Sequence, residues 1–161
     1  MGPAATLELR TESVDQTLAL AEYAARQLGP GDVVALVGEL GAGKTRFVEG
    51  ACRGLGYRGR VRSPSFTLLN VYRGGRVIYH FDLYRWEPGG HAFELAEWEE
   101  LMDGEGVAFV EWAERLGDSL PARAWRITFA FAGDDARWIR MQVPTSVLAT
   151  LRATLARWVP A

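Results

Sequence analysis

The chain has 161 residues, of which 48% are hydrophobic and 24% are charged, and its formal net charge is −2. One domain of about 150 residues accounts for this length, so we expect residues 1–161 to form a single domain. The composition excludes an intrinsically disordered or collagen-like chain, and the small net charge predicts no global attraction to nucleic acid.

The cysteine content and the hydropathy of the chain bear on its compartment. Its one cysteine, Cys52, cannot form a disulfide within the chain, which is typical of a reducing compartment. No apolar stretch approaches the roughly 18 residues that span a bilayer, and the N-terminus lacks the basic and apolar pattern of a signal peptide. We therefore expect a cytoplasmic protein with no membrane partner.

The first third of the chain alternates between the patterns of strands and of helices. Ser13 and Gln16 form a capping-box signature, after which apolar residues recur at helical spacing up to Leu28. The run at 33–37 is aliphatic throughout, which is typical of a strand buried on both faces of a parallel sheet. The predicted elements are a strand at 6–9, a helix at 14–28, a strand at 33–37 and a helix at 44–55.

The rest of the chain adds two hairpins and two helices to this pattern. Gly74 and Gly75 separate two strand-like runs, and a second pair of runs flanks a turn at 133–135. This order predicts an α/β fold with a mixed, mainly parallel central sheet, flanked by helices and by β-hairpin additions. The predicted elements are strands at 66–72 and 77–84, a helix at 91–102, a strand at 107–110, strands at 125–131 and 138–143, and a helix at 147–159.

A phosphate-binding loop pattern lies between the strand at 33–37 and the helix at 44–55. A strand before the loop and a helix after it aim backbone N–H groups at a bound phosphate. In such a loop Lys44 reaches the β and γ phosphates of a nucleotide, and the hydroxyl of Thr45 binds Mg²⁺. The predicted nucleotide-binding residues of the loop are Gly38, Glu39, Leu40, Gly41, Ala42, Gly43, Lys44 and Thr45.

Two acidic residues are candidates for completing a Mg²⁺ site. Glu111 directly follows the apolar strand at 107–110, at the edge where open α/β sheets bind ligands. Asp82 lies near the end of its own strand and shares a face with His80 under period-two alternation. Each carboxylate alone fits a solvated strand end equally well, and the neighbouring loop favours a role for both. For His80 we expect packing or a hydrogen bond rather than catalysis.

The arginines of the irregular segment at 57–64 leave two interpretations. Arg58, Arg60 and Arg62 form either a solvated loop or a clamp for the phosphoryl group that a small-molecule kinase transfers. The guanine-reading Asn-Lys-x-Asp motif of Ras-type GTPases is excluded, because the only lysine, Lys44, follows Gly43.

Four motifs in this order resemble those of the TsaE family, the ATPases of bacterial tRNA threonylcarbamoyladenosine synthesis. They are the loop at 38–45 and the segments at 63–67, 80–85 and 110–112. The resemblance implies a P-loop NTPase fold, ATP and Mg²⁺ as ligands, and action with the TsaB and TsaD proteins, through which the chain meets tRNA indirectly. It implies that ATP hydrolysis supports TsaB and TsaD as they modify the adenosine beside the anticodon in tRNAs that read codons beginning with A.

The same resemblance assigns roles to individual residues. Lys44 is expected to bind phosphate, Thr45 and Glu111 to hold Mg²⁺, and Asp82 to assist either Mg²⁺ or the attacking water. The expected catalytic residues are thus Lys44, Asp82 and Glu111. No arginine stands where a built-in arginine finger would, so we expect slow hydrolysis by the isolated chain and stimulation by a partner.

Two further residues are expected to bind the nucleotide. Ser65 matches a switch-like hydroxyl position of the family, and Trp112 matches a tryptophan near the nucleotide or a partner. The residues themselves leave two alternatives to an ATPase open. These are a small-molecule P-loop kinase and a nucleotide-gated binding module without essential hydrolysis.

Overall fold

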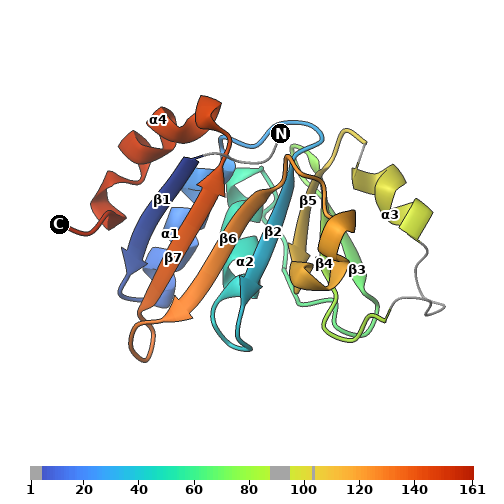
Figure 1. Ribbon diagram of the computed structural model, residues 1–161, viewed down its shortest axis with the longest axis horizontal. Coiled ribbons are helices and arrows are strands. Elements are labelled where there is room, and N and C mark those ends of the chain that lie inside the picture. The colour runs from blue at the N-terminus through green and yellow to red at the C-terminus, as the bar shows by residue number, and fades with distance from the viewer. Residues whose placement is uncertain (1–4, 88–94, 103) are drawn as a thin grey trace.

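Seven strands form one mixed sheet in the computed structural model, which describes residues 5–87, 95–102 and 104–161 (Figure 1). Their bounds are Ala5–Thr11 (β1), Val33–Gly38 (β2), Leu69–Arg73 (β3), Val77–Asp82 (β4), Val107–Glu111 (β5), Trp125–Phe131 (β6) and Arg137–Val143 (β7). The strands lie in the order β1-β7-β6-β2-β5-β4-β3.

The four central strands, β6, β2, β5 and β4, run parallel to one another. Antiparallel pairing adds β7 and β1 at one edge and β3 at the other. Both predicted hairpins are confirmed, as β3 with β4 and as β6 with β7. Because parallel strands end at the same edge of a sheet, the segments that follow β2, β4 and β5 lie close together.

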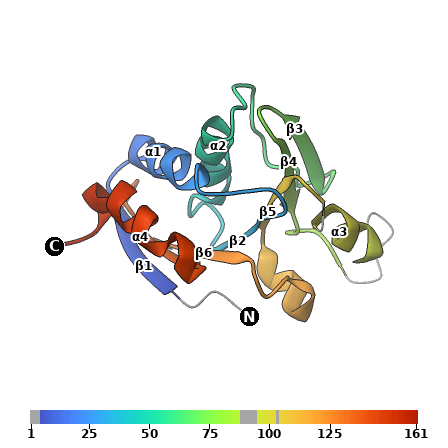
Figure 2. The same ribbon diagram turned by 90° about the horizontal axis from the view of Figure 1, so that it is seen from above.

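Helices cover both faces of this sheet. Their bounds are Val14–Ala25 (α1), Lys44–Gly54 (α2), Leu95–Met102 (α3) and Thr145–Thr154 (α4), with 3₁₀ helices at Ala113–Ser119 (η1) and Ala156–Trp158 (η2). Helices α1 and α2 lie side by side on one face, and η1 lies on the other (Figure 2). Helix α4 contacts β1, and α3 contacts β5. Within the described ranges, no helix has the length and apolarity that crossing a membrane requires.

The central strands are buried on both faces, as the aliphatic run in β2 predicts. Val34 and Leu36 belong to the core beneath α1 and α2, whereas Val33 and Ala35 belong to a second core that η1 covers. All four side chains are at most 1% exposed. Period-two alternation therefore divides one continuous apolar segment between two cores.

Several element boundaries differ from the sequence prediction. The strand expected from residue 66 begins at Leu69, because the backbone N–H of Leu68 donates to the carbonyl oxygen of Pro64 and closes a turn. The strand expected to reach residue 84 ends at Asp82, whose carboxylate accepts the backbone N–H of Tyr84. The helix expected at 91–102 is described from Leu95 onward, and 91–94 lie outside the described residues.

Glycine allows α1 and α2 to approach closely. A Cβ atom on Gly50 of α2 would lie 2.3 Å from the carbonyl oxygen of Leu18 in α1. A Cβ on Gly54, one turn later, would lie 2.3 Å from the carbonyl oxygen of Glu22. Both clashes involve backbone atoms, so a larger residue at either position must push the helices apart.

We predict that Gly50→Ala lowers the free energy of unfolding by about 2 kcal/mol, through overpacking against α1. Alanine favours a helix interior over glycine by about 1 kcal/mol, so helix propensity alone predicts the opposite sign. Urea denaturation measures the change, with Arg53→Ala on the exposed surface of α2 as the control. An unchanged or raised stability of the Gly50 variant would contradict the close helix contact.

The sole cysteine provides a second test of the core. Cys52 is 0% exposed in α2, and burial together with the charge of Glu49 raises the pKa of its thiol to about 12. A thiol-specific reagent at pH 8 should therefore modify native protein very slowly and urea-unfolded protein rapidly. Fast modification without denaturant would contradict the burial of this helix face.

Candidate functional site

The phosphate-binding loop joins the carboxyl end of β2 to the first residue of α2. Gly41 and Gly43 adopt left-handed backbone conformations, with φ angles of 81° and 114°. L side chains rarely adopt these values, which explains glycine at both positions. The carbonyl oxygen of Gly43 accepts the backbone N–H of Phe47 and starts the helix. The loop thus presents a helix N-terminus at the carboxyl edge of the sheet.

Arg137 at the start of β7 binds the backbone of the phosphate-binding loop. Its Nε donates to the carbonyl oxygen of Ala42 at 3.0 Å, and its Nη2 donates to that of Gly41 at 3.3 Å. Its Nη1 donates to backbone carbonyl oxygens of the β6–β7 turn, including that of Ala136 at 2.8 Å. The sequence gives no signal for this residue, because nothing in the local pattern indicates that β7 reaches a loop nearly a hundred residues earlier in the chain.

Lys44 is the first residue of α2, and its side chain turns back over the loop. The Nζ donates to the carbonyl oxygens of Gly38 and Glu39, the second at 2.9 Å. It also lies 4.2 Å from the centroid of the Trp112 ring, within the range of a cation–π contact. Burial lowers the pKa of the Lys44 ammonium, and the negative charge of Glu111 offsets part of that shift.

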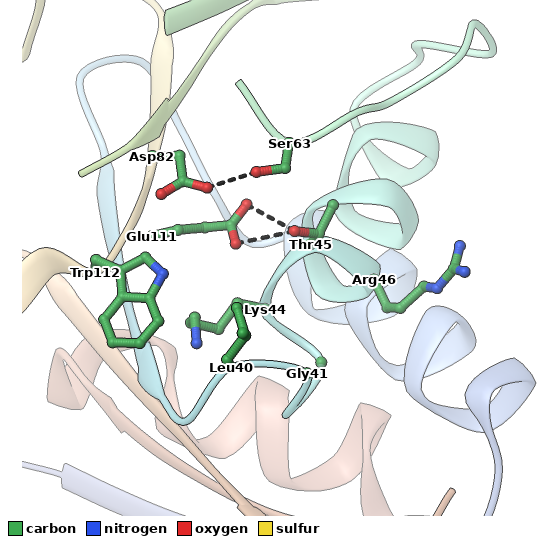
Figure 3. A pocket seen from close by; sticks show the side chains of 10 residues that line it. Leu40, Gly41, Lys44, Thr45, Arg46, Ser63, Asp82, Glu111 and Trp112 are labelled. Atoms are coloured by element: carbon green, nitrogen blue, oxygen red, sulfur yellow. Dashed lines mark hydrogen bonds between the residues drawn. The ribbon is translucent and has the colours of Figure 1, made fainter. Parts of the chain in front are cut away.

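Thr45 and Glu111 meet directly although they are far apart in the chain. The Thr45 hydroxyl lies 2.9 Å from Oε1 and 3.0 Å from Oε2 of Glu111 (Figure 3). Glu111 is the last residue of β5, which pairs with β2 in parallel, so the pairing sets its carboxylate beside the N-terminus of α2. The structure thus brings the two residues that were expected to hold Mg²⁺ into direct contact.

Asp82 at the end of β4 lies in the same cavity. Its Oδ2 accepts a short hydrogen bond from the hydroxyl of Ser63, and its Oδ1 accepts the backbone N–H of Tyr84 at 2.9 Å. Asp82 and Glu111 are register partners in adjacent parallel strands. Ser65 is the serine that the sequence motif predicts at the site, whereas in the structure the hydroxyl of Ser63 donates to Asp82.

Trp112 has an unusual backbone conformation for a residue with a side chain. Its φ of 57° and ψ of 40° place it in the left-handed region, directly after Glu111. The sharp turn brings its ring beside that of Tyr84, with 4.9 Å between the centroids, and beneath the Lys44 ammonium. Strained residues of this kind are frequent at functional sites.

These residues surround one cavity of about 310 Å³. Leu40 lies at its mouth with 72% of its surface exposed. The side chain of Arg46 points away from the two carboxylates (Figure 3). The described residues that line the cavity are Leu40, Gly41, Gly43, Lys44, Thr45, Arg46, Ser63, Asp82, Glu111 and Trp112; Ser65 is not one of them.

The charges in the cavity favour a cation. Asp82 and Glu111 are 4% and 3% exposed, and they face one buried ammonium, that of Lys44, which is 4% exposed. Two buried carboxylates against one ammonium leave a net negative charge, which is costly without a further positive partner. Among the residues that the structure describes, no group of three or more His, Cys, Asp or Glu side chains could hold a metal ion. This oxygen donor set suits Mg²⁺, which commonly binds one or two carboxylates together with phosphate and water.

A second, smaller cavity of about 120 Å³ lies next to the first and shares Gly41, Gly43 and Arg46 with it. Its other walls come from the start of α1 and from the β6–β7 turn. The lining residues outside the loop and α2 are Val14, Thr17, Asp135 and Arg137. The loop therefore has a cavity on each side.

Comparison with known proteins places this chain in a family. The family model described as threonylcarbamoyl adenosine biosynthesis protein TsaE matches residues 11–139. The chain is 41% identical over 134 residues to the tRNA threonylcarbamoyladenosine biosynthesis protein TsaE of Bacillus subtilis, which covers 83% of each chain. The protein of the same description from Treponema pallidum is 38% identical over 129 residues, which cover 80% of this chain and 95% of the relative. The crystal structure of Bacillus subtilis YdiB has a TM-score of 0.77 and 35% sequence identity, and the match covers 95% of both chains.

We predict that Arg137→Ala loosens the phosphate-binding loop without unfolding the sheet. Two hydrogen bonds to loop carbonyl groups are lost, each worth about 1 kcal/mol, so amide exchange at 39–43 should rise by roughly tenfold or more. Hydrogen–deuterium exchange measures this effect. The control is Arg140→Ala. Arg140 lies in the same strand as Arg137, and its substitution removes an exposed ion pair with Glu8 of β1. Equal exchange in both variants would contradict the support of the loop by Arg137.

Proposed function

This chain belongs to the TsaE family of threonylcarbamoyl adenosine biosynthesis proteins, and from that premise we propose that it is an ATPase that binds and hydrolyses Mg-ATP. One observation carries the proposal: a glycine-rich loop at a helix N-terminus faces two buried carboxylates across a single cavity. A loop of this kind binds phosphate, and acids opposite it suit a phosphate-bound cation.

The loop and Lys44 would hold the phosphates. Backbone N–H groups at the start of α2 supply fixed partial positive charge, and the Lys44 ammonium supplies a full one. Lys44 at present donates to the carbonyl oxygens of Gly38 and Glu39. Phosphate oxygens are stronger acceptors than these carbonyl groups, so we expect the ammonium to turn toward them on binding.

Thr45 and the two acids would hold the Mg²⁺ that accompanies the nucleotide. The cation neutralises charge that develops on the phosphate oxygens during transfer. The Thr45 hydroxyl already contacts the Glu111 carboxylate, and Asp82 is the register partner of Glu111 in the pairing of β4 with β5. The side chains are therefore arranged before the ligand arrives, which limits the reorganisation that binding requires.

Asp82 would also orient the attacking water. Ser63 and the backbone N–H of Tyr84 fix its two oxygens, and each oxygen keeps capacity for a further hydrogen bond. Water attack on the γ phosphorus releases ADP and phosphate. No side chain in the described part of the cavity is an arginine directed at the acids, since Arg46 points away from them. This arrangement favours slow hydrolysis by the chain alone.

The smaller cavity would hold the nucleoside. It adjoins the larger cavity at Gly41, Gly43 and Arg46, and neither Asp82 nor Glu111 lines it. A nucleotide whose phosphates fill the larger cavity would extend its ribose and base in this direction. Its mixed walls, from Val14 to Asp135, suit a flat ring with polar edges.

For the biological role, we propose that hydrolysis supports TsaB and TsaD as they form threonylcarbamoyladenosine on tRNA. The family description and the names of the relatives connect the chain with this modification. The site contains phosphate-binding and cation-binding groups, so the threonylcarbamoyl transfer itself would take place on a partner. The chain would then meet tRNA through that complex.

The deciding experiment measures phosphate release from ATP and Mg²⁺ by the chain alone and with TsaB, TsaD and tRNA. Modified tRNA is scored over many turnovers in the same reactions. Stimulated hydrolysis together with sustained modification is the expected result. Transfer of phosphate to a small-molecule acceptor, or modification that does not depend on this chain, would overturn the proposal.

We predict that Glu111→Gln and Asp82→Asn each slow hydrolysis by about two orders of magnitude, because each removes a charge from the cation site and keeps the shape of the side chain. Lys44→Ala should weaken nucleotide binding as well as turnover. The matched control is Glu114→Gln, which neutralises an exposed acid three residues after Glu111. Normal hydrolysis by both the Glu111 and the Asp82 variant would show that the site is assigned wrongly.

A further inference from the structure

His80 is a buried side chain that the proposed hydrolysis does not use. It is 0% exposed and lies in β4, two residues before Asp82 and therefore on the same face of the strand. Its Nε2 lies 2.6 Å from Oε2 of Glu111, and its Nδ1 lies 3.0 Å from the hydroxyl of Tyr72. Both ring nitrogens thus have partners: Glu111 at the proposed cation site and Tyr72 in the neighbouring strand β3.

Glu111 is held from two sides as a result. The Thr45 hydroxyl contacts both carboxylate oxygens, whereas His80 contacts Oε2. A carboxylate only accepts hydrogen bonds, so His80 donates the proton on its Nε2 to Glu111. The ring therefore limits rotation of the carboxylate and leaves Oε1 on the side of Thr45.

Tyr72 in β3 connects this contact to the loop at 57–64. Its hydroxyl lies 3.1 Å from the carbonyl oxygen of Arg62, and its ring stacks on that of Tyr57 with 4.9 Å between the centroids. Asn70 donates to the same carbonyl oxygen at 3.1 Å. Burial raises the pKa of the Tyr72 hydroxyl, so it remains a hydrogen-bond donor at neutral pH. A continuous series of contacts runs from the backbone of Arg62 to Glu111.

We propose that His80 is a positioning residue for Glu111, and that Tyr72 links this positioning to the loop at 57–64. A carboxylate held from two sides presents the same oxygen to a cation each time, whereas one held by a single contact can rotate. In metal sites, loss of such an outer hydrogen bond typically weakens metal binding by about 10- to 100-fold. The inference rests on the proposed binding of Mg²⁺ with nucleotide and names the residue that orients its ligand.

A histidine that only fills space would respond differently to two related substitutions. The amide nitrogen of glutamine can take the position of Nε2, and that of asparagine can take the position of Nδ1. His80→Gln therefore keeps a donor to Glu111 and loses the contact with Tyr72. His80→Asn loses the contact with Glu111. If His80 served only in packing, both variants would lose binding, and the donor that glutamine keeps toward Glu111 would make no difference.

The test is calorimetric titration of the full chain and its variants with ADP, in the presence of Mg²⁺ and in EDTA. We expect His80→Asn to weaken the Mg²⁺-dependent part of binding by at least about tenfold and His80→Gln to stay within about threefold of the wild type. Tyr72→Phe should lie between the wild type and His80→Asn. Binding in EDTA should be unchanged in all three variants.

Ile78→Val is the matched control, because Ile78 lies on the same face of β4 and is also 0% exposed. It should lower the melting temperature and leave the Mg²⁺ dependence unchanged. Equal losses of Mg²⁺ dependence in the glutamine and asparagine variants would overturn the positioning role. Wild-type Mg²⁺ dependence in His80→Asn would overturn it as well.

A spectroscopic measurement tests the contact without nucleotide. The chain contains two histidines, so His91→Asn identifies the imidazole signals of His80 in a nitrogen–proton correlation spectrum. The expected signature is a proton on Nε2 whose signal shifts in Glu111→Gln. If the wild type binds no Mg-ADP, the proposed function is refuted. The spectrum would still show whether His80 donates to Glu111, because that measurement needs no nucleotide. A proton on Nδ1 alone, or a signal that ignores Glu111→Gln, would overturn the inference.

Discussion

The structure depends on how three buried charges are compensated at the carboxyl edge of the sheet. Lys44, Asp82 and Glu111 are each at most 4% exposed, and a buried charge without partners costs several kcal/mol. Each has an assigned partner: backbone carbonyl groups for Lys44, Ser63 for Asp82, and a threonine and a histidine for Glu111. The remaining negative charge makes this edge receptive to a cation, and the parallel centre of the sheet brings the groups together.

Support for the site comes from parts of the chain that contribute nothing to the phosphate-binding motif itself. Arg137 in the C-terminal hairpin binds the loop through the carbonyl groups of Gly41 and Ala42, and as a donor it occupies no N–H group of the loop. Tyr72 and His80 in the hairpin of β3 and β4 support Glu111 from the opposite side. Each hairpin therefore contributes to the site, because the β6–β7 hairpin carries Arg137, which binds the loop, and the β3–β4 hairpin carries His80, which contacts Glu111.

The family match covers the residues that surround the two cavities. The family match runs over residues 11–139 and so includes the phosphate-binding loop, both acids, His80 and Arg137. Helix α4, from residue 145 onward, lies beyond it, and Leu151 of this helix and Leu155 directly after it belong to the core at the β1 edge. The part of the chain that forms the cavities therefore falls within the matched region, and the last helix covers the core.

The sequence by itself determined the α/β class, the two hairpins and the strand–loop–helix unit of the phosphate site. Aliphatic runs, paired glycines and the spacing of Gly38, Gly43 and Lys44 are local signals, and local backbone and burial preferences suffice to interpret them. It also put Asp82 and Glu111 at strand ends. Only the tertiary structure decided which groups meet there. Strand pairing and loop closure bring together residues far apart in the chain, so the contacts of Ser63, His80 and Arg137 leave no periodic trace in the sequence.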